Sequence, residues 1–235
     1  MSCKEITLKN NEKRTLEYVN FSDLKIELAE GSNLLLKLAN FGENSNINIY
    51  GKIGKNAGIS VVFADFSRGF CKIISQIDLA EEGANCDWHL ATLANKNDNK
   101  TFDISFKHLV GNTTSNMDNY GVARDNSKIV FSGVSHIAEK AKKSNAKQNA
   151  KIIVFDPESQ GVASPILKID ENDVQASHGA VVGQLNSDHM FYLMSRGLTR
   201  EEARTIITLG YLKPVSNKFS EEVQLKIEDA IKEVM

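Results

Sequence analysis

Apolar and polar residues alternate along most of this chain, from about residue 22 to residue 180. The apolar residues Leu24, Ile26 and Leu28 are separated by Lys25 and Glu27, and the same period of two returns in later segments. This period is typical of β-strands with one buried face, because successive side chains point to opposite faces of a sheet. The other segments of this kind are 34–38, 47–49, 59–63, 73–79, 102–106, 129–131, 152–154 and 166–169. The sequence therefore predicts a mainly β body.

The turns between these segments repeat one theme. Residues 28–33 read LAEGSN and residues 79–85 read LAEEGAN, and Gly31, Gly58 and Gly83 follow at steps of 27 and 25 residues. Self-similarity at such a period is typical of stacked repeats. None of the three prolines precedes residue 157, which suits uninterrupted strand pairing. We expect a solenoid of short strands; an antiparallel jelly roll would explain the alternation equally well, but the repeated turns less well.

After residue 184 the apolar period becomes helical. The expected helix starts are Asn186 or Ser187, Thr199 and Ser220; the expected stops are Gly197 and Gly210, with Pro214 barring continuation of the second helix. The residues expected to bury are Met190, Phe191, Leu193 and Met194, then Ala203, Ile206, Ile207 and Leu209, then Val223, Ile227, Ala230, Ile231 and Val234. We therefore predict a β body over 1–184 and a small helical domain over 185–235.

Bulk properties restrict the class of protein. The formal charge is −2 and the sequence pI is about 6.2, so we expect no nucleic-acid partner. The sequence has neither a leader-like apolar start nor an apolar run of membrane-spanning length, and we expect a cytoplasmic protein without membrane contact. The odd cysteine count, Cys3, Cys71 and Cys86, indicates reduced thiols, and the apolar neighbours of Cys71 and Cys86 predict buried structural residues.

Familiar catalytic patterns are absent from the sequence. Ser177 and His178 are adjacent, outside any Gly-x-Ser-x-Gly elbow, which argues against a hydrolase. Residues 51–58, GKIGKNAG, lack the Gly-Lys-Ser/Thr ending of a phosphate-binding loop. No two histidines have zinc-site spacing; His89, His108, His136 and His189 are expected to be partly buried or exposed structural residues. We expect no enzyme activity.

His178 is the candidate site residue. It precedes Gly179 where the β body meets the helices, and a glycine there gives the backbone freedom to direct a side chain outward. The residues alone leave two readings open: a histidine that ties the junction together by hydrogen bonds, or a ligand.

Residues 138–151, AEKAKKSNAKQNAK, have the composition of an exposed helix. Their lysines are expected to form a solvated face rather than a partner-binding patch. Taken alone, this segment predicts a helix inside the β body.

The stretch around His178 resembles the C-terminal signature of the SufB/SufD family of Fe–S cluster assembly proteins, and of SufD in particular. The matching segments are 177–180 (SHGA), 182–185 (VGQL), 190–193 (MFYL), 195–198 (SRGL) and 201–204 (EEAR), with weaker matches at 131–133 (FSG), 148–149 (QN), 164–165 (SP) and 173–174 (DV). The resemblance is specific over about 120–215 and is one of repeat style before residue 100.

The resemblance implies a right-handed parallel β-helix followed by a helical domain, and it places residues 138–151 in turns and strands. It implies a subunit of a SUF-type Fe–S assembly scaffold that dimerises through the β-helix, with a SufB-like subunit or with itself. The helical domain would dock a SufC-type ATPase, through the polar residues of 187–213 in our reading. His178 would contact iron or an Fe–S cluster transiently, as a neutral imidazole ligand.

The chain also departs from the SufD pattern. Ala176 stands two residues before His178, where SufD proteins often have cysteine, and no cysteine follows Cys86. The chain is shorter than common SufD proteins and is expected to lack their N-terminal helical domain, which suggests a minimal member. Two alternatives remain: a purely structural SufD-like partner without a cluster ligand, and a β-helix carbohydrate-active enzyme, disfavoured by a single Trp and the absent leader.

Overall fold

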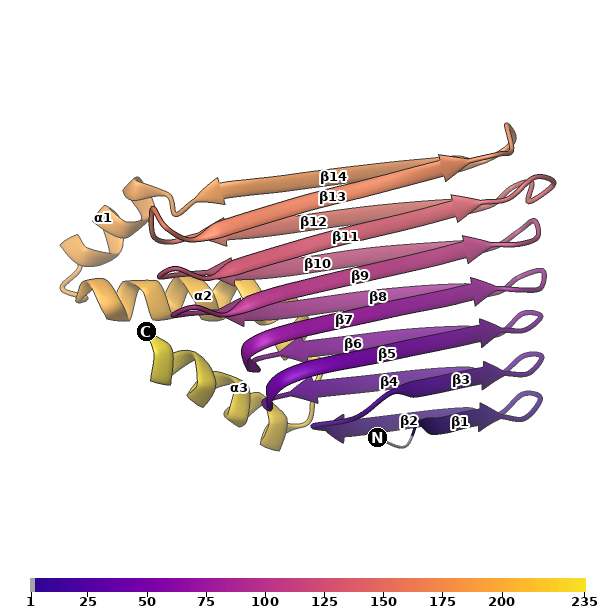
Figure 1. Cartoon of the computed structure of the whole chain (residues 1–235), viewed down its shortest axis with the longest axis horizontal. Helices are drawn as coiled ribbons and strands as arrows, with labels where there is room; N and C mark the ends of the chain where they lie inside the picture. Colours follow the sequence, from indigo (N-terminus) through magenta and orange to yellow (C-terminus); the bar gives the residue numbers. More distant parts are fainter. Residues whose placement is uncertain (1–2) are drawn as a thin grey trace.

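The computed structural model describes residues 3–235 and is a parallel β-helix followed by three helices (Figure 1). Fourteen strands form two seven-stranded sheets, in which every pair of neighbours is parallel. The odd sheet contains β1 (Lys4–Leu8), β3 (Leu24–Leu28), β5 (Glu43–Ile53), β7 (Arg68–Leu79), β9 (Asn99–His108), β11 (Lys128–Ile137) and β13 (Gln160–Ile169). The even sheet contains β2 (Lys13–Val19), β4 (Asn33–Asn40), β6 (Gly58–Asp65), β8 (Asn85–Ala94), β10 (Thr114–Ala123), β12 (Asn145–Val154) and β14 (Gln175–Gln184).

Each coil of the β-helix takes one strand from each sheet. In Figure 1 the odd strands run to the right in front, the even strands run to the left behind, and the coils climb from the N-terminus, which makes the helix right-handed. The predicted mainly β parallel solenoid is confirmed, and the jelly roll is excluded because all ladders are parallel.

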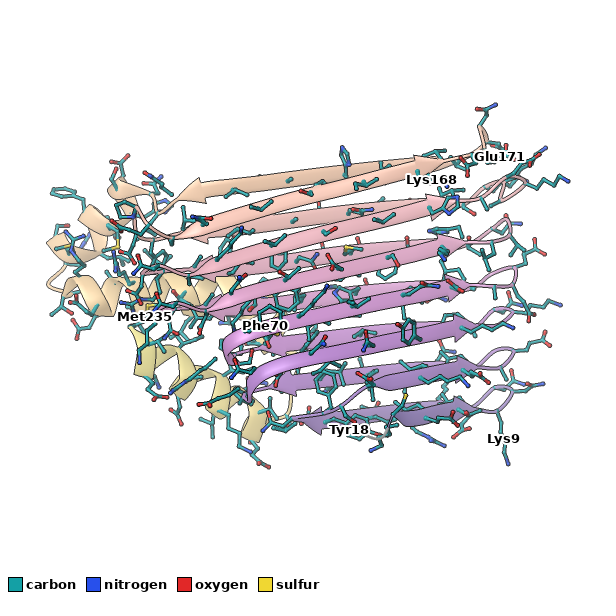
Figure 2. The ribbon with its side chains drawn as sticks, viewed as in Figure 1. Lys9, Tyr18, Phe70, Lys168, Glu171 and Met235 are labelled. Carbon is teal, nitrogen blue, oxygen red and sulfur yellow. The ribbon has the colours of Figure 1, made fainter. Side chains whose placement is uncertain are left out.

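The core lies between the two sheets, where the inward residues of successive coils stack in register (Figure 2). Aromatic rings contact one another from coil to coil: Phe63 meets Trp88 edge-on at 6.3 Å between centroids, and Phe102 meets Phe131 at 5.6 Å. The alternation read from the sequence is the alternation of these inward residues with outward ones, because a parallel in-register ladder keeps each residue on its face.

The coils turn at one end through residues in the left-handed backbone region. These residues are Asn11, Gly31, Asn56, Gly83, Asn112 and Lys143. Glycine and asparagine occupy this region at little cost, which explains their choice at five of the six positions. Gly58, taken from the sequence as the second marker of the repeat, lies instead at the start of β6; Asn56 holds the equivalent turn position.

Two segments differ from what residue patterns alone predict. The β-helix begins before residue 22, with β1 and β2, whose short runs carry too little alternation to stand out. Residues 138–144 form turns and 145–151 belong to β12, so the helix suggested by composition is wrong and the placement implied by the resemblance is correct. Buried Ala146, Gln148 and Ala150 explain why: their inward positions fix the strand period despite high helix propensity.

The C-terminal helices are α1 (Ser187–Ser195), α2 (Arg200–Ser216) and α3 (Glu221–Val234). Asn186 caps α1, and Thr199 and Glu202 form the predicted capping box of α2. The predicted end of α2 at Gly210 is wrong, because α2 runs through Gly210 and Pro214. Its last turns bury Leu212 and Val215, and this burial offsets the backbone hydrogen bond that Pro214 removes.

Helices α2 and α3 pack on the outer face of the even sheet. The shared cluster contains Val62, Ala64 and Ala91 of the sheet together with Val223 and Ile227 of α3. The predicted buried stripe of α3 is thus confirmed at Val223, Ile227 and Ile231. None of the helices within residues 3–235 is both long and apolar enough to cross a membrane.

Candidate functional site

The C-terminal end of the β-helix is open. Strands β13 and β14 are the terminal strands of their sheets, so each has a hydrogen-bonded neighbour on only one side. Most residues of β13 and β14, inward ones included, are partly or fully exposed. The exposed large apolar residues of this end are Val162, Ile166, Ile169, Val181 and Val182. In Figure 2, Lys168 and Glu171 mark the same end of the stack near its turn. Unpaired strand edges of this kind are a template for pairing with another chain.

His178 lies on this open end. It sits in the middle of β14 and is in register with Gln148 of β12, which is in register with Met117 of β10, above Trp88 of β8. Trp88, Met117 and Gln148 are buried, whereas His178 is exposed because no further coil covers it. His178 therefore occupies the last position of an inward-facing column. It lies on the surface because β14 belongs to the last coil. The sequence located His178 at the junction with the helices; the structure places it within the terminal strand.

One chain does not complete a metal site around His178. Within residues 3–235, no cluster of three or more His, Cys, Asp or Glu residues has the geometry to hold a metal ion. Cys86 belongs to the column of Ser115, Ala146 and Ala176, three coils below Ala176 and so about 14 Å from the open end. Cys71 lies on the opposite sheet, in register with Lys100 of β9.

The two buried cysteines, Cys71 and Cys86, have low thiol reactivity. Burial raises the pKa of both the Cys71 and the Cys86 thiols far above the usual value, which keeps them protonated and poorly nucleophilic. Cys3 is exposed. The prediction that Cys71 and Cys86 are buried structural residues is confirmed.

The other histidines have local polar partners or lie on the surface. His89 and His136 hydrogen-bond to Asp87 and Asp170 at 2.8 Å each. His108 was expected to be at most partly buried, yet its side chain is fully buried, between Thr113 and Ser115.

The helical region presents an apolar surface that sequence patterns did not predict. Of the four residues expected to bury in α1, only Met190 does; Phe191 is 75% exposed, and Met194 is also exposed. Tyr192 of α1 and Ile206 of α2 are exposed as well. Helix α1 projects past β14 and packs mainly on α2 (Figure 1), and within residues 3–235 the Phe191 and Met194 side chains of its apolar face stay exposed. An unpartnered apolar face of this kind marks an interaction surface.

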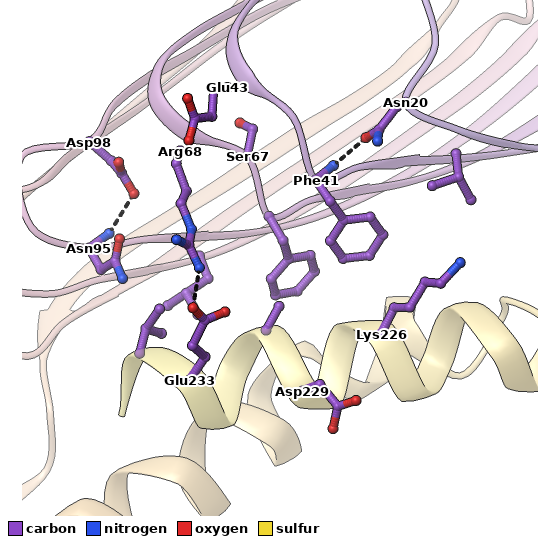
Figure 3. Close-up of a pocket in the computed structure, with 15 residues that line it drawn as sticks. Asn20, Phe41, Glu43, Ser67, Arg68, Asn95, Asp98, Lys226, Asp229 and Glu233 are labelled. Atoms are coloured by element: carbon purple, nitrogen blue, oxygen red, sulfur yellow. Dashed lines mark hydrogen bonds and ion pairs between the residues drawn. The ribbon is translucent and has the colours of Figure 1, made fainter.

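A cavity of about 550 Å³ lies between α3 and the bends of the coils (Figure 3). The stacked rings of Phe41 and Phe66 line it, and the ion pair between Arg68 and Glu233, at 2.6 Å, crosses it. Four carboxylates, those of Glu43, Asp98, Asp229 and Glu233, and two cations, Arg68 and Lys226, line the cavity. This mixed lining does not point to one class of ligand.

These features define a structural class: a right-handed parallel β-helix with an uncovered terminal coil and helices packed on one face. A family model described as "SUF system FeS cluster assembly, SufBD core domain" matches residues 11–211. The chain belongs to this SufBD core family.

Known relatives agree with this assignment. Iron-sulfur cluster assembly protein SufD of Bacillus subtilis is 40% identical over 99 residues, 42% of this chain and 23% of that protein. An iron-sulfur cluster assembly SufBD family protein of Staphylococcus saprophyticus is 27% identical over 154 residues, and SufB of Bacillus subtilis 26% over 154 residues; each match covers 66% of this chain and 33% of the relative. The matches thus span a third or less of the length of these relatives.

Proposed function

We propose that this chain is a non-enzymatic subunit of a SUF-type Fe–S cluster assembly scaffold. The observation that carries the proposal is the open end of the β-helix, where His178 occupies the last position of an inward column on an unpaired strand. Membership of the SufBD core family supports the same function.

The open end is the proposed dimerisation surface. A partner strand laid along β13 or β14 would satisfy backbone groups that now lack a strand neighbour, and it would cover Val162, Ile166 and Val182. The partner is a second copy of this chain or a SufB-like subunit. Either one would convert the exposed position of His178 into a buried one at the interface.

His178 is the proposed iron or cluster contact, and the iron or cluster is cargo that is held transiently. A neutral imidazole can replace a thiolate on iron. Since residues 3–235 hold no group of three or more metal-ligating side chains, the partner would supply ligands that complete the site. The variant His178→Ala is expected to fold normally and to lose iron, whereas His189→Ala, on the exposed first turn of α1, keeps it.

The helices α1 and α2 are the proposed dock for a SufC-type ATPase. Our sequence reading assigned contact to the polar residues of 187–213 and folding to the apolar ones. The exposure of Phe191, Met194 and Ile206 supports the reverse assignment, with these apolar side chains as anchors. Phe191→Asp is expected to abolish ATPase binding, and Leu225→Asp, at another exposed apolar position on α3, is the matched control.

The decisive experiment is anaerobic co-purification of this chain with a SufC-type ATPase, with and without a SufB-like protein. Stoichiometry, iron and acid-labile sulfide are recorded for the native chain and for His178→Ala. A complex whose iron depends on His178 supports the proposal. No complex under any combination would refute it.

A purely structural partner is the second candidate. The observation in its favour is that Ala176 stands beside His178 and that the two buried cysteines lie coils away. In that case the complex forms, but its iron content is the same with His178→Ala as with the native chain.

A further inference from the structure

Gln148 lies directly below the proposed site, and it is the only one of the buried column residues Trp88, Met117 and Gln148 that carries a carboxamide. Its side chain is 2% exposed, and it is in register with His178 above and Met117 below. The column thus changes from apolar to polar one coil before the open end. A buried amide in an otherwise apolar column is costly unless it makes specific hydrogen bonds.

The amide of Gln148 crosses the core from the even sheet to the odd sheet. Its Nε2 donates to the hydroxyl of Ser135 on β11, at 2.7 Å, and to the main-chain carbonyl of Ile166 on the terminal strand β13, at 3.1 Å. One side chain therefore joins β12, β11 and β13. No other side-chain hydrogen bond within residues 3–235 reaches the backbone of β13.

Gly133 makes room for this crossing. A Cβ at Gly133 would lie 2.8 Å from Oε1 of Gln148 and 3.0 Å from Sδ of Met117. Oε1 faces this space, and no donor in residues 3–235 reaches it. The structure thereby joins two short segments that the sequence singled out separately, 131–133 and 148–149.

We infer that Gln148 is a positioning residue of the open end: its amide is a strut that holds β13, and with it the edge presented to a partner, at a fixed distance from β12. The strut matters here because β13 has a strand neighbour on one side only and its inward residues have no coil above them. A docking edge that is held in place before binding loses less conformational freedom when it binds. The inference rests on the proposed dimerisation through this end.

Amide hydrogen exchange on the isolated chain tests the strut without any partner. Gln148→Met keeps the length of the side chain and removes the donor. Exchange along β13 is expected to become about fivefold faster, which corresponds to one lost hydrogen bond, while β9 is unchanged. Asn119→Leu is the matched control, an amide-to-apolar change at a buried inward position of β10. It should leave β13 as it is.

Gly133→Ala tests the same contact from β11, since the new methyl group would displace the Gln148 amide. It should reproduce the faster exchange along β13. Equal acceleration in all strands, or none in β13, overturns the strut.

The self-association constant of the same variants is the second readout, with about a fivefold weakening expected for Gln148→Met and Gly133→Ala alone. Faster exchange with unchanged association overturns the positioning role. Failure of the native chain to associate with itself or with a SufB-like chain refutes the proposed function instead, and leaves the exchange result standing.

Discussion

Lys100 and Asp65 form an ion pair inside the β-helix, with Nζ and Oδ2 2.7 Å apart and neither side chain exposed to solvent. The Asp65 carboxylate also accepts hydrogen bonds from Asn40, Ser67 and Thr92. Donors from several coils therefore converge on one buried carboxylate. A buried charge is tolerated when it is fully paired in this way, and each partner becomes indispensable to the other.

Removal of one partner should be strongly destabilising. Lys100→Met leaves the Asp65 charge uncompensated in the core, and we expect a loss of about 3–5 kcal/mol in the free energy of unfolding. Urea denaturation measures it. Lys25→Met, which removes a cation from an exposed pair with Glu27, is the control and should barely move the midpoint. Equal midpoints for the two variants would contradict the role of the buried pair.

Thiol reactivity should separate the three cysteines. In the native chain a thiol reagent is expected to label Cys3 alone, because burial raises the pKa of the other two thiols and also blocks access to them. In denaturant all three should react. Cys3→Ser should make the native chain unreactive, and rapid labelling of that variant would show that the coils open readily.

Acid should weaken the fold through His108. Burial, with a smaller contribution from His136, lowers the pKa of His108 from 6.5 to about 4. Above pH 6.5 the ring is neutral in both the folded and the unfolded chain, so its titration costs the fold no stability. Between pH 6.5 and about 4 the unfolded chain binds a proton that the native chain does not, so stability falls as pH falls, by up to about 3 kcal/mol. Unfolding free energies at pH 7 and pH 4.5 measure this loss, and His108→Gln should flatten the dependence.

The helices should be anchored to the coils by Arg204. Its guanidinium donates to Asp156 at 2.8 Å and lies over the ring of Phe155. Although burial raises the pKa of Asp156, the backbone N–H of Asp125 and the Arg204 cation lower it below the usual value overall. Arg204→Ala is expected to cost about 1 kcal/mol, since the pair is partly screened by solvent, and to speed proteolysis of α1 and α2. Arg200→Ala, on the exposed first turn of α2, should leave the digestion rate unchanged.

The sequence specified the β-helix because its core obeys one local rule. Inward and outward residues alternate in every coil, and stacking keeps them on their faces, so a period of two is visible without knowledge of the fold. The starts of α1 and α2 could be predicted for a similar reason, since the side chains of Asn186 and Thr199 accept hydrogen bonds from backbone N–H groups two or three residues further along the chain. Lys100 obeys the same rule: its spacing of two and four residues from Phe102 and Ile104 puts it on the same inward face, and this pattern could have indicated a buried cation.

The features that the sequence did not predict depend on contacts between distant segments. The passage of α2 through Pro214 follows from packing on the even sheet, and the exposure of Phe191 follows from the position of α1, which packs mainly on α2 within residues 3–235. The location of His178 in register with Gln148 depends on strand pairing, which residue patterns do not record. The role of His178 itself stays a prediction.

The turn positions differ in one respect that affects assembly of the fold. The intervals between Asn11, Gly31, Asn56, Gly83, Asn112 and Lys143 are 20, 25, 27, 29 and 31 residues, so the coils contain more residues toward the open end than at the N-terminal end. A chain of identical coils could stack with any coil misplaced by a whole repeat. Here most misplaced coils would be too long or too short for their neighbours, and the surplus residues would break the ladder. This gradient in coil length favours the native stacking order and guards the folding chain against slippage.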